Sequence, residues 1–179
     1  ANLIICLIKV PNNTVIDKYH YKMINDHSFV KMIKRDFDII LVKTCTLCSN
    51  TEVNGQSIGT VFFDDGIMEQ LNELSGEDKR FLAITDFSKN DYSYHIAVEN
   101  KNKTHSHMPR MHIDMSLWGC FETCGDQPIS VQTMSDRIGE WLNSNEYILQ
   151  KNIRIDIFDL RDPCKVYTLI PVKKGHIVS

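Results

Sequence analysis

Three residues in the middle of the chain, His95, His112 and Asp114, have the types and spacing of an acid–base site. They belong to segments 92–99 and 110–118, in which apolar and polar residues alternate as in half-buried strands. If the two segments pair as a hairpin, His95 faces Asp114, and His112 shares their polar face. An imidazole beside a carboxylate can act as a general base or as part of a metal site.

Two more histidines, His105 and His107, lie in the polar linker between these segments and extend the cluster to an imidazole-rich patch. The alternative is an ordinary solvated sheet face, because antiparallel sheets commonly keep one face in water. A catalytic histidine works in a cleft, so the catalytic hypothesis also needs a cover over this face.

Two short-spaced cysteine pairs, each following a predicted strand, form a second candidate site. Their CxxC and CxxxC spacings can hold one structural zinc ion through four thiolates. One alternative is that the cysteines are reduced and inert. The other is that they form disulfides in a secreted chain, which the presence of two N-glycosylation sequons supports. The cysteines concerned are Cys45, Cys48, Cys120 and Cys124.

A charged group near the C-terminal end, formed by Asp156, Asp159, Arg161 and Asp162, has the composition of a metal cluster. Aspartate is locally favoured in turns, so a solvated turn is the preferred interpretation. The sequence carries no phosphate-binding glycine loop, no nucleophile elbow and no HExxH motif.

Composition and charge narrow the class of protein. A chain of 179 residues with 42% hydrophobic and 24% charged residues is typical of one globular domain. The net charge is −3 and the basic residues are scattered, which argues against duplex nucleic acid as a partner. The apolar stretch Leu3–Ile8 is far shorter than the roughly 20 residues of a membrane span, and it is also too short for the apolar core of a signal peptide. We therefore expect a protein of the cell interior.

The hydrophobic periodicity predicts a single α+β domain over 1–179, with a mixed, mostly antiparallel sheet and about three helices packed on it. The order of elements lacks the regular βα alternation of a doubly wound sheet. The predicted helices lie within 15–35, from Asp64 or Asp65 to Gly76, and from Ser130 to Leu142. The predicted strands are 2–10, 37–46, 57–63, 80–87, 92–99, 110–118 and a closing hairpin of 153–157 with 166–172.

A well-patterned fold without a catalytic signature favours a non-enzymatic domain that binds another protein. In composition the chain is similar to phage or viral host-interaction proteins and to toxin-immunity proteins, which suggests the host cytoplasm or a virion as its location. One alternative is a small hydrolase or nuclease that uses the histidine cluster. The other is a structural component with a cysteine zinc site. The partner and the oligomeric state stay open.

Overall fold

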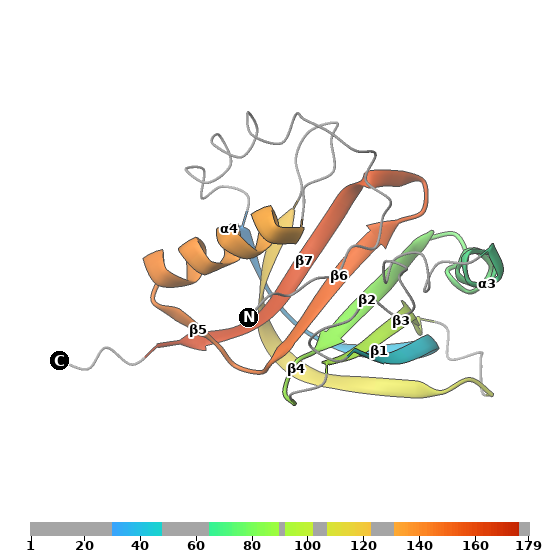
Figure 1. The fold of residues 1–179 in the computed structure, drawn as a ribbon, viewed down its shortest axis with the longest axis horizontal. Coiled ribbons are helices and arrows are strands. Elements are labelled where there is room, and N and C mark those ends of the chain that lie inside the picture. The colour runs from blue at the N-terminus through green and yellow to red at the C-terminus, as the bar shows by residue number, and fades with distance from the viewer. Residues whose placement is uncertain (1–29, 48–64, 90–91, 102–106, 123–130, 176–179) are drawn as a thin grey trace.

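The structure is a computed structural model that describes residues 30–47, 65–89, 92–101, 107–122 and 131–175. In this part of the chain seven strands form a sheet, and two helices pack against it (Figure 1). The helices are α3 (Asp65–Leu74) and α4 (Val131–Ser144). The strands are β1 (Val30–Leu47), β2 (Arg80–Asp86), β3 (Tyr92–Glu99), β4 (Arg110–Glu122), β5 (Tyr147–Leu149), β6 (Ile153–Asp159) and β7 (Asp162–Lys174).

The strands follow the order β4-β1-β3-β2-β6-β7-β5, and every pairing is antiparallel. Because β4 also pairs with β7, six of the strands close into a ring. Each of the six contributes side chains to an apolar interior, since alternate residues of a strand face the same way. The interior residues are Phe37, Ile39, Leu82, Ile84, Ala97, Ile113, Trp118, Ile155 and Leu169.

The opposite face of the sheet carries the helices, one at each end (Figure 1). Ile67 and Leu71 of α3, spaced four residues apart on one helical face, pack on an apolar cluster from β1, β2, β3 and β6. On α4, the corresponding face is formed by Met134, Ile138 and Trp141, which pack on side chains of β4 and β7. Each helix therefore covers a separate cluster on this helix-side face.

The C-terminal end of α3 confirms the predicted stop signal. The amide of Ser75 donates to the carbonyl of Leu71, and Gly76 follows with a φ of 56°. Glycine adopts this left-handed conformation without a steric penalty. The turn then leads directly into β2.

The coarse fold prediction is confirmed: the structure has one mostly antiparallel sheet with helices packed on it. The described residues contain two helices where about three were expected, and β5 was not predicted. Segments 2–10 and 57–63 lie outside the described residues. Neither described helix is long and apolar enough to cross a bilayer.

The helix predicted within 15–35 is wrong from Val30 onward, because β1 begins there. Val30 and Ile33 are three residues apart, which fits one face of a helix. In β1 they lie on opposite faces: Val30 packs against the α4 cluster and Ile33 against the interior of the ring. The three-residue spacing of two apolar residues therefore did not distinguish a helix from a strand.

Candidate functional site

The predicted hairpin between β3 and β4 is wrong. β1 lies between these strands, with Thr44 opposite His95 on one side and Asp38 opposite His112 on the other. Period-two alternation identifies a strand and its faces, but it does not identify the neighbouring strand. The register that placed His95 beside Asp114 is therefore not formed.

His95 and Asp114 also point to opposite faces of the sheet. Ala97 and Ile113 both belong to the interior cluster. By alternation along β3, His95 shares the inner face with Ala97, whereas Asp114 and His112 flank Ile113 and face outward. The three residues proposed for catalysis do not form one site.

Only the outward pair remains as a local contact. His112 Nε2 lies 3.8 Å from a carboxylate oxygen of Asp114 and 3.8 Å from one of Asp36. The side chains of His112 and Asp114 are 52% and 84% exposed, which is an open surface without a cleft. His107 is exposed too, and His105 lies outside the described residues.

His95 is a buried ring with one defined partner. Its Nδ1 lies 2.8 Å from the hydroxyl oxygen of Thr44, and the residue is 8% exposed. Burial lowers the pKa of His95, and the nearby carboxylate of Asp86 offsets part of that effect. The environment therefore favours the neutral imidazole.

The two described cysteines of the predicted zinc site do not come together. Cys120 pairs with Lys31 near the start of β1, while Cys45 lies near the end of the same 18-residue strand. Both are free thiols, and burial raises the pKa of Cys120. Cys48 and Cys124 lie outside the described residues. A zinc ion binds thiolate sulfurs at about 2.3 Å, so Cys45 and Cys120 in these positions cannot bind the same ion.

The other described residues also contain no cluster of side chains that could bind a metal ion. No cluster of three or more histidine, cysteine, aspartate or glutamate side chains there is arranged to hold a metal ion. This includes the aspartates near the C-terminal end that have the composition of such a cluster.

The helix-side face carries a site that the sequence reasoning missed. Between the clusters under α3 and α4, four polar side chains from β2, β6 and β7 form a buried group, here called the polar strip. Their exposed fractions run from 0 to 6%. The members of the polar strip are Thr85, Arg154, Asp156 and Thr168.

Asp156 is the centre of the polar strip. Arg154 donates to its carboxylate from Nε and from a terminal nitrogen, at 3.0–3.1 Å. The hydroxyl of Thr168, directly opposite on β7, donates at 2.6 Å. A buried carboxylate is tolerated only with partners of this quality, because the loss of hydration costs several kcal/mol.

Thr85 completes the polar strip from β2. It lies opposite Arg154 on one side and opposite Tyr94 of β3 on the other. Its hydroxyl is fully buried and has no hydrogen-bond partner among the described residues. Tyr94 is equally buried and adds an aromatic ring to the same face.

The sequence held a weak signal for this site. Arg154 and Asp156 alternate with Ile153, Ile155 and Ile157, which suggested a half-exposed strand. β6 instead lies between β2 and β7, and its second face is buried as well. On this central strand the two opposite charges, two residues apart, form a buried ion pair.

No family model matches this sequence, and none of the curated proteins matches it. Solved structures show the fold. The chain is similar to SAV2435 bound to tetraphenylphosphonium, with a TM-score of 0.62 and 15% identity over 80% of this chain and 93% of that one. It is also similar to a protein from Staphylococcus aureus MU50 named for bacterial transcription regulation, with a TM-score of 0.58 and 17% identity over 82% and 98% of the two chains.

A third similar structure is the C-terminal domain of EcmrR, with a TM-score of 0.50 and 10% identity over 81% and 97% of the two chains. At identities this low, the similarity shows a shared architecture and does not identify corresponding functional residues. The chain therefore has the fold of these three proteins.

Proposed function

We propose that the chain is a non-enzymatic binding domain for a small, largely apolar organic cation. The observation that carries the proposal is the buried carboxylate of Asp156 at the centre of the helix-side face, between two apolar clusters. In this proposal, the ligand lies along the polar strip and replaces Arg154 as the counter-charge of Asp156, which Arg154 neutralises in the free protein.

The physical case rests on where the carboxylate lies. Opposite charges attract far more strongly in a poorly hydrated interior than in water, so one buried carboxylate can select a cation. The flanking clusters and the ring of Tyr94 provide the apolar surface that binding sites use for most of their contact area. The unpartnered hydroxyl of Thr85 adds one orienting polar group.

The fold adds independent support. SAV2435 was solved with tetraphenylphosphonium, which is a lipophilic cation, and its architecture covers most of this chain. A second similar structure is named for transcription regulation. Both are compatible with a domain that senses a small molecule instead of converting it.

Binding must be coupled to a local rearrangement, because the residues of the polar strip are only 0–6% exposed. We therefore expect slow association, because a required conformational change lowers the association rate constant. Stopped-flow quenching of the tryptophan fluorescence would measure this rate.

The direct experiment is a calorimetric titration with tetraphenylphosphonium and with its uncharged relative triphenylphosphine oxide. We expect the cation to bind at least about tenfold more tightly, a difference of roughly 1.4 kcal/mol. Equal affinities would remove the role of the buried charge. An absence of saturable binding by any lipophilic cation would overturn the proposal.

A pair of variants separates binding from folding. Asp156→Asn alone leaves Arg154 buried without its counter-ion, so a loss of binding there is ambiguous. The double variant Arg154→Met/Asp156→Leu replaces the ion pair by apolar side chains of similar size, which is often neutral for stability. It should fold and lose the preference for the cation, while Asp114→Asn on the outer surface should bind like the wild type.

The protein partner expected from the sequence stays a prediction, as do the viral or toxin-immunity setting and the exclusion of duplex nucleic acid. The enzymatic alternative required His95 beside Asp114, and this arrangement is not formed, since the two residues face opposite sides of the sheet. A pull-down of the full chain from host extract, repeated with excess tetraphenylphosphonium, would test whether a protein partner exists and responds to the ligand.

A further inference from the structure

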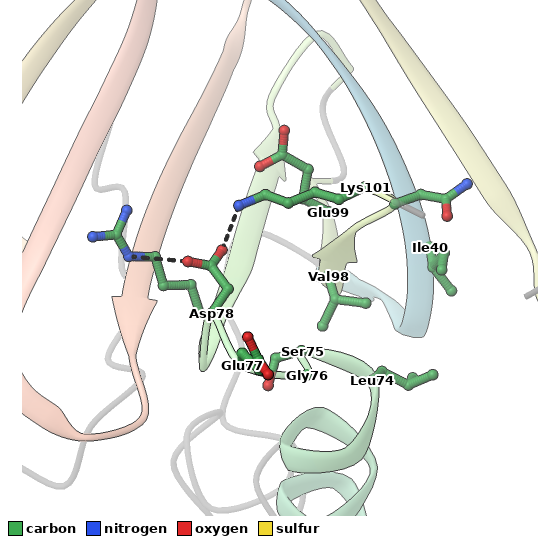
Figure 2. A pocket seen from close by; sticks show the side chains of 11 residues that line it. Ile40, Leu74, Ser75, Gly76, Glu77, Asp78, Val98, Glu99 and Lys101 are labelled. Carbon is green, nitrogen blue, oxygen red and sulfur yellow. Dashed lines mark hydrogen bonds and ion pairs between the residues drawn. The ribbon is translucent and has the colours of Figure 1, made fainter. Parts of the chain in front are cut away.

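A second concave site lies away from the polar strip, where the last turn of α3 meets the end of β3 (Figure 2). It has a volume of about 480 Å³, within the range of roughly 300–1,000 Å³ typical of small-molecule sites. None of the residues of the polar strip lines it. The two sites are therefore separate.

This pocket combines an apolar part with a charged rim. Ile40 of β1, Leu74 of α3 and Val98 of β3 contribute the apolar surface. The rim carries charges of both signs from two chain segments, 77–80 and 99–101. The charged residues are Glu77, Asp78, Arg80, Glu99 and Lys101.

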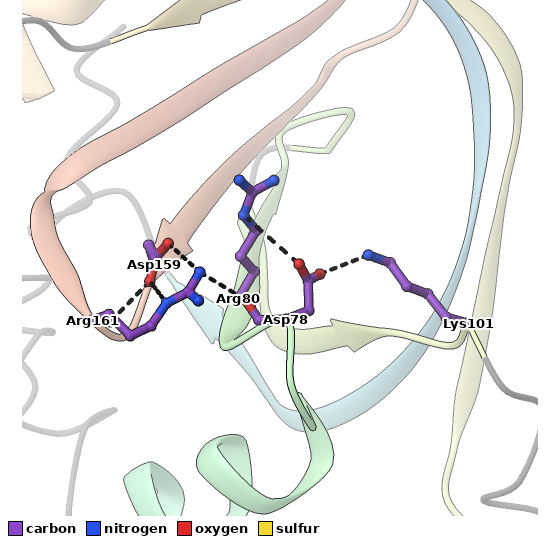
Figure 3. A network of polar contacts seen from close by, with 5 residues as sticks. All are labelled: Asp78, Arg80, Lys101, Asp159 and Arg161. Carbon is purple, nitrogen blue, oxygen red and sulfur yellow. Dashed lines mark hydrogen bonds and ion pairs between the residues drawn. The ribbon is translucent and has the colours of Figure 1, made fainter.

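Asp78 lies between two cations on this rim. Lys101 reaches from the end of β3, and its Nζ lies 2.6 Å from one carboxylate oxygen of Asp78 (Figure 2). On the other side, Arg80 Nε lies 4.0 Å from the second oxygen (Figure 3). Glu99, the neighbouring acid, is already paired with Arg35. Opposite charges thus stand a few ångströms apart above apolar surface.

Arg80 is the group whose bonding is incomplete. Its Nε is buried and has no hydrogen-bond partner among the described residues, because 4.0 Å to Asp78 is too long for one. The nearby Asp159 accepts from Arg161 at 2.9 Å through both oxygens and forms no hydrogen bond with Arg80 Nε (Figure 3). A buried donor without an acceptor is unfavourable, so an anionic group at this position would be favoured.

The ion pair that spans the rim is easily exchanged. The side chains of Lys101 and Asp78 are 54% and 37% exposed, and ion pairs at this exposure contribute little to stability. A ligand that offers both a carboxylate and an ammonium group could take the place of each partner without leaving a charge unpaired.

We propose that this pocket binds a small zwitterion with an apolar side group, the chemistry of an aliphatic α-amino acid. Its carboxylate accepts from Lys101 Nζ and from Arg80 Nε, which is buried in the free protein and becomes accessible when the Arg80 side chain shifts. Its ammonium group donates to Asp78. The side group lies on Leu74 and Val98. This site is independent of the cation site proposed above and takes a ligand of different charge.

The test is a titration of the full chain with L-leucine and with two truncated relatives. 3-Methylbutylamine lacks the carboxylate, and 4-methylpentanoate lacks the ammonium group. We expect saturable binding of leucine and at least tenfold weaker binding of each relative. Equal affinities for the three compounds, or no binding of leucine up to about 10 mM, a ceiling near 3 kcal/mol of binding free energy, would overturn the proposal.

Variants locate the site and separate it from the polar strip. Arg80→Gln and Asp78→Asn should each lower the affinity for leucine at least tenfold, with little change in the melting temperature measured without leucine. Lys151→Gln, on an exposed turn, is the charge-matched control and should bind normally. The double variant Arg154→Met/Asp156→Leu should also keep leucine binding. Unchanged affinity in Arg80→Gln would contradict the assignment.

Discussion

The hydroxyl of Thr168 donates a 2.6 Å hydrogen bond to the carboxylate of Asp156, across the junction between β7 and β6. The two residues are register partners and are 1% and 3% exposed. A one-residue slip of β7 would turn Thr168 to the opposite face and leave the acceptor with one partner fewer. The bond therefore fixes the register of the two strands beneath the polar strip.

Replacing Thr168 by valine should destabilise the fold by about 1.5–3 kcal/mol, the range for a hydrogen bond to a charged group. Valine keeps the branched shape and removes only the donor. Urea unfolding would measure the change. Thr46→Val, on the exposed part of β1, is the matched control and should stay within roughly 0.5 kcal/mol of the wild type. Equal effects of the two variants would show that the buried bond contributes nothing.

Stability should depend on pH through His95. Burial lowers the pKa of His95 below its ordinary value of 6.5, so near that pH the unfolded chain binds a proton more readily than the folded chain. The stability attributable to the neutral ring is present above pH 6.5 and is lost as the pH falls toward the folded pKa. Unfolding curves at about pH 5 to 8, in wild type and His95→Gln, should show a shallower slope in the variant. Identical slopes would argue that the ring titrates equally in both states.

The Asp159–Arg161 pair gives a second, more acidic transition. The side-chain hydrogen bond from Arg161 holds the pKa of Asp159 at about 2, below its ordinary value of 3.8. A lowered carboxyl pKa contributes stability above pH 3.8 that is lost as the pH falls toward 2. A carbon NMR titration should find the Asp159 midpoint near 2 in wild type and closer to 3.8 in Arg161→Gln. Lys151→Gln should leave the midpoint unchanged.

Two glycines should respond oppositely to alanine. A Cβ on Gly119 of β4 would lie 3.3 Å from a ring carbon of Trp141 and 3.4 Å from one of Phe121, so the packing of α4 must shift. We expect a loss of about 1–3 kcal/mol, as for other overpacked sites. At Gly139, within α4, a methyl group would meet no atom within 4 Å, and alanine there should stabilise by up to roughly 1 kcal/mol. Thermal unfolding of both variants tests the pair, and a stabilised Gly119→Ala would contradict this packing.

Local structure was predictable wherever one periodicity dominated. The apolar stripe and the glycine stop defined α3, and strict alternation defined β3 and the first part of β4. Neighbour relations were not predictable from these patterns. β1 inserts between β3 and β4, a pairing between segments far apart in sequence that no local signal encodes.

The candidate site could not be predicted for the same reason. An aspartate flanked by isoleucines is equally compatible with a solvated and a buried position, and the difference is decided by what covers the second face of β6. His95 illustrates the reverse case. Its alternation with apolar residues suggested a wet face, whereas the closed ring of strands buries that face as the interior.

The double pairing of β4 has a consequence for biosynthesis. β1 is among the first of these strands to leave the ribosome, yet it obtains one neighbour only when β4 emerges, and β4 in turn waits for β7, the last strand. Assembly that depends on contacts so distant in sequence is slow. The nascent chain should therefore stay sensitive to proteases until translation has passed β7, and it should acquire resistance in a single late step.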